Sequence, residues 1–116
     1  MDGGRFVADQ IGLPALVAGA DLVVTGEGTY DWRSLRDSAT AAVSELAMTT
    51  GIPAVALAGQ VRVGRREAMT AGLSGTYAVS ERPEEVAAAL ADPVGTLEAR
   101  AARVAATWSP APESAP

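Results

Sequence analysis

The sequence predicts an α/β protein, in which a parallel β-sheet carries helices on both faces. Three short β-like runs alternate with longer helix-like segments along the 116 residues, which is the order of βαβ units. The runs at residues 21–25 and 53–59 are mostly apolar, as strands must be when helices cover both faces of a sheet. Consecutive strands should therefore be joined by right-handed crossovers.

The first strand is expected at residues 21–25, with the sequence DLVVT, and Gly26 is expected to end it. A helix should follow over residues 34–51, because its apolar residues recur at spacings of three and four and Gly51 supplies a stop. These apolar residues are Leu35, Ala39, Ala42, Val43, Leu46 and Ala47.

The second strand is expected at residues 53–59, with the sequence PAVALAG. There is room for a short helix between Gly59 and Gly72. Its expected inner face consists of Ala68, Met69 and Ala71. The third strand is expected at residues 75–80, with the sequence GTYAVS, because β-branched and aromatic residues favour strands.

Two more helices are expected after the third strand. Pro83 suits the first turn of one helix, where Glu84 and Glu85 favour the positive helix end. Pro93 should begin the other helix, which has apolar residues at spacings of four, three and four. These residues are Leu97, Ala101, Val104 and Trp108. The proline-rich sequence SPAPESAP, residues 109–116, is expected to be a disordered tail, which leaves one domain over residues 1–108.

The composition excludes several kinds of chemistry. The chain has no cysteine and no histidine, so a disulfide framework, a cysteine nucleophile and the usual zinc ligands are all absent from it. It also has no lysine, which excludes a Walker-type phosphate lysine and a Schiff base from this chain. Any metal chemistry must therefore use oxygen ligands and a hard ion such as Mg²⁺.

Charge and hydropathy limit the partners. The formal net charge of −5 argues against a nucleic-acid surface, which needs clustered positive charge. The first residues lack the regions of a secretory signal peptide, and no apolar run approaches the roughly 20 residues that span a bilayer. We therefore expect a cytoplasmic protein that binds neither nucleic acid nor membrane.

Acidic residues and glycines follow the first strand, in the sequence TGEGTYDWRS. Ligands of open parallel sheets bind beyond the carboxyl ends of the strands, so Glu27 and Asp31 are expected at the edge where chemistry would occur. The segments AGQVRVGRRE and SERPEE should reach the same edge. A structural interpretation remains open, because Gly26 and Gly28 also suit a plain turn, and Asp31 or Ser34 could simply cap the helix that follows.

The second of these segments carries three arginines, Arg62, Arg65 and Arg66. Guanidinium groups match phosphate oxygens in a bidentate way. An arginine pair at a helix start on an acidic protein usually forms part of a solvated face, so these residues do not decide the function.

Read together, the three strand ends resemble the C-terminal part of the bacterial glycerate kinases of the first type, which phosphorylate D-glycerate with ATP. That family shows a strand leading into Thr-Gly-Glu-Gly, then an aspartate, a glutamine, a serine and a leucine, and later an apolar strand ending in Ala-Gly. The matching residues here are Thr25, Gly26, Glu27, Gly28, Asp31, Ser34, Leu35, Ala58 and Gly59. The resemblance runs from about Phe6 to Trp108.

The chain departs from the family pattern in three respects. Arg33 stands where the family has glutamine, and Asp37 to Thr40 replace a Gly-Lys-x-Pro segment. The N-terminal portion of the family has no counterpart here. The resemblance therefore implies an incomplete Rossmann-like or flavodoxin-like domain, whose exposed sheet edge and face favour self-association.

The resemblance also implies roles for individual residues. Asp31 would act as the base or orient the substrate hydroxyl, and Glu27 would position substrate or a water bound to Mg²⁺. The residues Thr25, Gly26, Gly28 and Ser34 would contact substrate or phosphate. ATP and Mg²⁺ would be the cofactors and glycerate the substrate, with no metal ligand assigned.

Two other classes of function stay open. The chain could be a non-catalytic remnant of a kinase, or a small α/β module that binds a ligand or associates with itself. A phospho-receiver is disfavoured because no lysine is present. A dinucleotide-binding fingerprint is disfavoured because Asp31 occupies the position of its third glycine.

Overall fold

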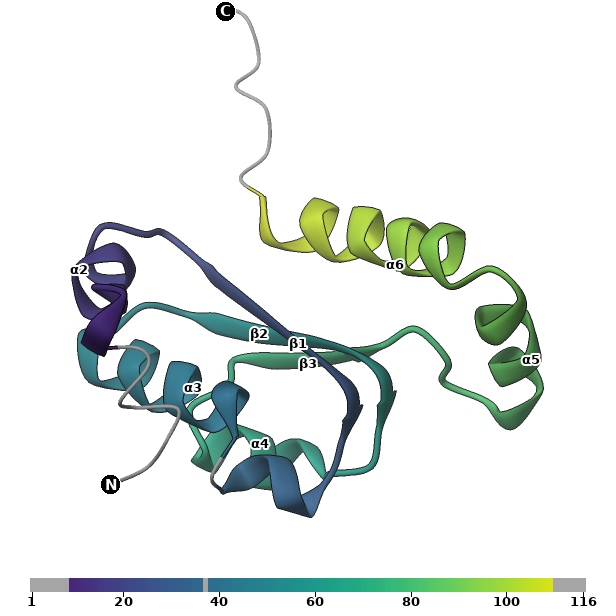
Figure 1. The fold of residues 1–116 in the computed structure, drawn as a ribbon, viewed down its shortest axis with the longest axis horizontal. Helices are drawn as coiled ribbons and strands as arrows, with labels where there is room; N and C mark the ends of the chain where they lie inside the picture. Colours follow the sequence, from purple (N-terminus) through teal and green to yellow (C-terminus); the bar gives the residue numbers. More distant parts are fainter. Residues whose placement is uncertain (1–8, 37, 110–116) are drawn as a thin grey trace, which may run out of the picture.

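The computed structural model describes residues 9–36 and 38–109, and it contains three strands and several helices in this part of the chain (Figure 1). In chain order these elements are α2 (Leu13–Ala18), β1 (Val23–Tyr30), η1 (Trp32–Leu35), α3 (Ala39–Thr50), β2 (Ala54–Val61), α4 (Arg65–Thr70), β3 (Gly75–Ala78), α5 (Pro83–Ala91) and α6 (Pro93–Trp108). The expected tail at residues 110–116 lies outside the described residues, and Ser109 follows α6 directly.

The three strands form one parallel sheet in the order β1-β2-β3, which confirms the α/β class. Because the sheet grows in one direction, right-handed crossovers place both connecting helices on the same face. Figure 1 shows α3 and α4 below the sheet and α6 above it. The sheet is therefore the middle layer of three, with its carboxyl ends near η1 and α5.

The core lies between the sheet and the lower helices. Alternate alanines of β2 face this layer, and their small side chains let α3 and α4 lie close to the sheet. The core cluster consists of Tyr30, Ala47, Ala54, Ala56, Ala58, Ala68 and Leu73. The helix α3 is closed at both ends, since the Ser38 hydroxyl accepts a hydrogen bond from the backbone N–H of Ala41 and Gly51 adopts a left-handed conformation.

The first strand extends further than the sequence predicts. The expected stop at Gly26 is wrong, because β1 continues through Gly-Glu-Gly to Tyr30. Parallel pairing with β2 explains this difference, as Gly26 lies opposite Leu57 and Glu27 opposite Ala58. The sheet's hydrogen bonds thus outweigh the turn preference of the glycines, and Glu27 lies within a strand.

The other element boundaries also shift. The single helix expected over residues 34–51 is divided into η1 and α3, because Arg36 is extended and Ser38 starts a new helix. The expected inner face of α4 holds for Ala68, which is buried, but not for Met69, which is 58% exposed. The helix α2 was not expected from the sequence, although Pro14 in its first turn is a typical start signal.

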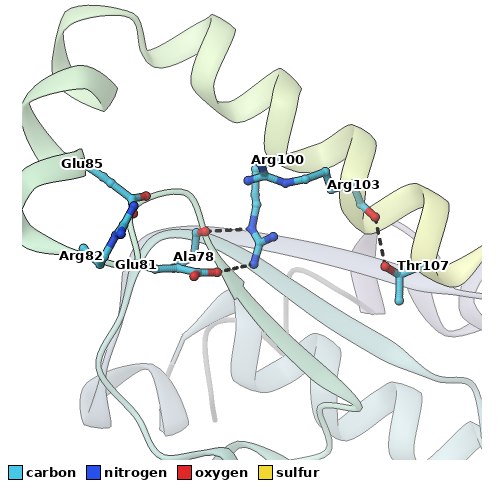
Figure 2. Close-up of polar contacts among 7 residues, drawn as sticks. All are labelled: Ala78, Glu81, Arg82, Glu85, Arg100, Arg103 and Thr107. Atoms are coloured by element: carbon cyan, nitrogen blue, oxygen red, sulfur yellow. Dashed lines mark hydrogen bonds and ion pairs between the residues drawn. The ribbon is translucent and has the colours of Figure 1, made fainter.

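The helix α6 is attached to β3 and to the segment after it by polar contacts of Arg100 and Trp108, and Figure 2 shows those of Arg100 with Ala78 and Glu81. The Arg100 Nε donates to the Ala78 carbonyl oxygen at 2.9 Å, and its Nη2 lies 2.7 Å from a Glu81 carboxylate oxygen. Its guanidinium also lies over the Tyr77 ring. Near the end of α6, Trp108 Nε1 donates to the Tyr77 hydroxyl at 2.7 Å. These contacts fix α6 above β3.

Replacing Arg100 by alanine should lower the free energy of unfolding by about 1–3 kcal/mol, because the Ala78 carbonyl and the Glu81 carboxylate lose a charged donor. Urea unfolding measures this change, and hydrogen exchange should show faster opening of α6. Arg103, which is exposed on the same helix, provides the matched control (Figure 2). Equal effects of the Arg100→Ala and Arg103→Ala substitutions would contradict this account of how α6 is held.

Candidate functional site

The candidate site lies at the carboxyl ends of the strands, where β1 delivers Glu27 and leads into Asp31. Among the described residues, no helix is long and apolar enough to cross a membrane. No group of three or more acidic residues close enough to hold a metal occurs in the same part of the chain. The candidate site is therefore described by its individual side chains and by the surfaces on the two faces of β1.

The Glu27 carboxylate belongs to the face that packs on the lower helices. Thr25 faces this layer, because its hydroxyl lies 3.3 Å from the Thr40 hydroxyl of α3. Side chains two residues apart in a strand share a face, which places Glu27 on the same side as Thr25. Its Oε2 atom is buried and has no hydrogen-bond partner among the described residues. Such a group is costly to bury, so it is suited to accept a hydrogen bond from a ligand or a metal-bound water.

Tyr30 lies close to this carboxylate and is almost fully buried. Burial raises the pKa of the Tyr30 hydroxyl, and the negative charge of Glu27 adds a smaller effect in the same direction. The sequence analysis did not select Tyr30, although an aromatic residue beside an acidic segment at the end of a strand could have indicated it.

The raised pKa of Tyr30 predicts a loss of stability at alkaline pH. The folded protein holds the hydroxyl proton more tightly than the unfolded chain, so this stabilisation is complete below the ordinary pKa of about 10 and falls as the pH rises through the folded-state value. Urea unfolding between about pH 8 and 11 should show a steeper decline for the wild type than for the Tyr30→Phe variant. If the free energy of unfolding falls equally with pH in the two proteins, the pKa of Tyr30 is the same in the folded and unfolded states.

Asp31 is engaged within the chain. Its Oδ1 accepts a hydrogen bond from the Arg33 backbone N–H at 2.9 Å, and its Oδ2 lies 3.5 Å from the Arg33 guanidinium. Its own N–H donates to the Ser34 hydroxyl at 3.1 Å, which completes a capping box at the start of η1. The structural interpretation of Asp31 as a cap is therefore correct, and its carboxylate is held in a fixed orientation.

Ser34 and Thr25 also have their hydroxyl groups engaged. The Ser34 hydroxyl receives the Asp31 N–H and lies 3.4 Å from the Thr29 carbonyl oxygen, and the residue is buried. Thr25 contacts Thr40. The expected contact of Thr25 and Ser34 with substrate or phosphate stays a prediction, and the geometry gives both residues a part in holding the acidic segment in place.

Gly26 and Gly28 lie on the opposite face of β1, where a groove of about 730 Å³ separates the strand ends from α5 and α6. We call this the α5–α6 groove. A Cβ atom added to Gly28 would meet nothing within 4 Å, so the groove floor is open at that position. Its walls are mainly apolar and include Leu57, Val86, Leu90 and Leu97. Glu27 and Thr29 of β1 also line this groove.

The three arginines of the second segment lie on the surface. Arg62 is exposed, and its Nη2 donates to the Gln60 Oε1 at 2.9 Å. Arg65 and Arg66 are exposed at the start of α4. Their position agrees with the solvated-face interpretation.

The donor set suits Mg²⁺ that arrives with a nucleotide. Mg²⁺ usually keeps several waters and is bound by one or two carboxylates together with substrate phosphates. The unpartnered Oε2 of Glu27 provides one suitable oxygen. The residues present therefore fit a cation shared with phosphates, without a protein cage around it.

Comparison with known proteins adds independent findings. A sequence model of the glycerate kinase family matches residues 1–109. An uncharacterised protein of Mycobacterium bovis is 34% identical over 104 residues, which cover 90% of this chain and 27% of that protein. A glycerate kinase of Bacillus cereus is 28% identical over 111 residues, covering 96% of this chain and 29% of the relative.

A solved structure shows the same fold. The crystal structure of a Salmonella typhimurium protein assigned as glycerate kinase 2 superposes with a TM-score of 0.52 at 24% identity, over 93% of this chain and 27% of that chain. The chain thus spans less than a third of the length of each of these relatives.

Proposed function

This chain belongs to the glycerate kinase family, and from this premise we propose that it supplies one wall of a site that transfers the γ-phosphoryl group of ATP to D-glycerate. Family membership supports a kinase role. The observation that carries the finer assignment is the buried, unpartnered Oε2 of Glu27 at the carboxyl end of β1. The cytoplasmic location stays a prediction.

Phosphoryl transfer requires alignment of the attacking hydroxyl more than covalent chemistry by the protein. We assign the alignment to the two acids of this segment. Glu27 would accept a hydrogen bond from substrate or from a metal-bound water. Asp31 would accept the proton of the attacking hydroxyl, since its capping bonds orient the carboxylate and leave oxygen lone pairs for a further partner. Its side chain is 19% exposed, which leaves it accessible.

The outer edge of β1 would contact the anionic groups. Among the described residues β1 pairs only with β2, so backbone N–H groups along its other edge, near Gly26 and Gly28, would meet a phosphate or the glycerate carboxylate. When bound, Mg²⁺ would neutralise charge on the transferring phosphoryl group. Among the described residues, Glu27 would meet its water shell through the unpartnered Oε2.

A second candidate function is a non-catalytic or self-associating binding module. The observation that favours it is the set of large apolar side chains exposed on the described surface. Those near the α5–α6 groove are Leu90, Val94 and Leu97, which are 78%, 74% and 46% exposed. Surfaces of this kind usually contact another polypeptide.

The two candidates are separated by a direct assay. Purified chain is supplied with ATP, Mg²⁺ and D-glycerate, first alone and then with the co-expressed remainder of a longer relative. Glycerate-dependent formation of ADP and phosphoglycerate under either condition supports the kinase function. Complete absence of phosphoglycerate in both conditions, with the chain folded, would favour the binding module.

A further inference from the structure

Arg62 lies beside the acidic segment at the carboxyl ends of β1 and β2. Its backbone N–H donates to the Tyr30 carbonyl oxygen at 2.7 Å. Because β1 and β2 pair in parallel with Tyr30 opposite Val61, this bond places Arg62 next to Asp31 on the neighbouring segment. The side chains of Arg62 and of the proposed base Asp31 therefore start from neighbouring points of the backbone.

The guanidinium of Arg62 is held in place without being neutralised. Its Nη2 donates to the Gln60 Oε1 at 2.9 Å, and Gln60 lines the α5–α6 groove. An amide oxygen orients the guanidinium but leaves its positive charge intact. Among the described residues, Arg62 forms no ion pair, whereas Arg33 and Arg100 each pair with a carboxylate. Most of the donor hydrogens of Arg62 thus remain available for an anion.

Arginine is the only kind of cationic side chain that this protein can offer to a phosphate. The chain contains no lysine and no histidine. In phosphoryl transfer, negative charge is spread over the oxygens of the γ-phosphate, and fixed positive groups beside them stabilise it. Arg33 is already paired with Asp31. Arg62 therefore supplies this edge with a second guanidinium, whose charge is not used within the described part of the chain.

We propose that Arg62 binds a phosphate group of the nucleotide, with its guanidinium oriented by Gln60. This role rests on the proposed phosphoryl transfer and adds a residue to that site. Exposure alone would suit a solvated face, as it does for Arg65 and Arg66 on α4. Two contacts distinguish Arg62 from these arginines, namely the hydrogen bond to Gln60 and the backbone bond beside the acidic segment.

Nucleotide binding tests this role separately from turnover. The Kd for ATP with Mg²⁺ is measured by calorimetry, for the chain alone and for the chain with the co-expressed remainder of a relative. In whichever form binds ATP, the Arg62→Gln substitution should weaken this Kd by about tenfold or more, because a charged contact with phosphate is lost. The Kd for D-glycerate should stay unchanged. The Arg62→Lys variant should recover part of the affinity for ATP, since lysine keeps the charge but not the fork.

Arg65 provides the matched control. It is exposed and lines a hollow of about 480 Å³ together with Tyr77 of β3, and β2 lies between β3 and β1. The Arg65→Gln variant loses the same charge from the same surface loop and short helix, but away from Asp31. It should bind ATP like the wild type. Thermal melts should show that all of these variants fold, because each changed side chain is exposed.

The outcomes separate this role from the kinase function. Binding of ATP that depends on Arg62 supports the role of Arg62 even if no phosphoglycerate forms. Turnover with an unchanged Kd for ATP in the Arg62→Gln variant overturns it and leaves the kinase function intact. The role is also overturned if neither form binds ATP, if the Arg62→Gln variant loses affinity for D-glycerate instead, or if the Arg65→Gln variant weakens ATP binding equally.

Discussion

Replacing Gly59 by alanine should lower the free energy of unfolding by about 1–3 kcal/mol, because the extra methyl group would overlap with the backbone of β1. A Cβ atom at position 59 would lie 2.6 Å from the carbonyl oxygen of Gly28. This contact is with a backbone atom and not with the end of a flexible side chain. The Gly28 carbonyl oxygen could therefore move away only if β1 itself shifted. Paired residues on either side, Glu27 with Ala58 and Thr29 with Gln60, hold the two strands together.

Gly28, the neighbour across the strand pair, is the matched control. A Cβ atom there meets nothing within 4 Å, and the residue lies in a strand where alanine adopts the backbone without strain. The Gly28→Ala variant should therefore be neutral or stabilised by up to about 1 kcal/mol. Urea unfolding of the two variants measures the contrast. Equal stability of both would show that the close approach of β1 and β2 does not depend on Gly59.

Replacing Glu27 by glutamine should reduce turnover by about a hundredfold or more, the usual effect of losing a positioned group at a transition state. The substitution keeps the shape of the side chain and removes its charge. Because the charged oxygen is buried without a partner, its removal should leave the free energy of unfolding unchanged or raise it. A fall in activity without a fall in stability is the expected signature, measured in whichever assembly has kinase activity.

Asp31→Asn is the companion variant, since asparagine caps helices about as well as aspartate. The lost ion pair with Arg33 is mostly exposed and should contribute little. The stability of this variant should therefore match the wild type. Loss of turnover would identify Asp31 as the base, whereas full turnover would restrict it to capping η1.

Full turnover of the Glu27→Gln variant would remove Glu27 from the mechanism.

The sequence predicted the succession of strands and most helices along the chain because their patterns are local. Alternating apolar runs, Gly51 as a helix stop and the proline starts of α5 and α6 depend only on neighbouring residues. The same reasoning ended β1 at Gly26, because it could not include the hydrogen bonds that β2 supplies from distant sequence. The C-terminal end of β1, which places Glu27 within the strand, therefore depends on long-range pairing with β2.

The positions of the two acidic residues were predicted in part. The motif identified Glu27 and Asp31 as neighbours at a strand end, and the structure places Glu27 within β1 and Asp31 directly after it. Sequence spacing could not show that Asp31 would use its oxygens to cap η1 while an oxygen of Glu27 stays unpartnered. It also could not place Gly26, Glu27 and Gly28 along the α5–α6 groove, since that placement follows from the extension of the strand to Tyr30.

The most direct test of the proposed function is the detection of phosphoglycerate, by mass spectrometry, from D-glycerate, ATP and Mg²⁺ in the presence of this chain and the co-expressed remainder of a relative. We predict phosphoglycerate with the wild-type chain and its loss with the Glu27→Gln chain in a complex of the same composition. A stable complex that forms no phosphoglycerate, or forms it equally with either chain, would contradict the proposed role of this acidic strand.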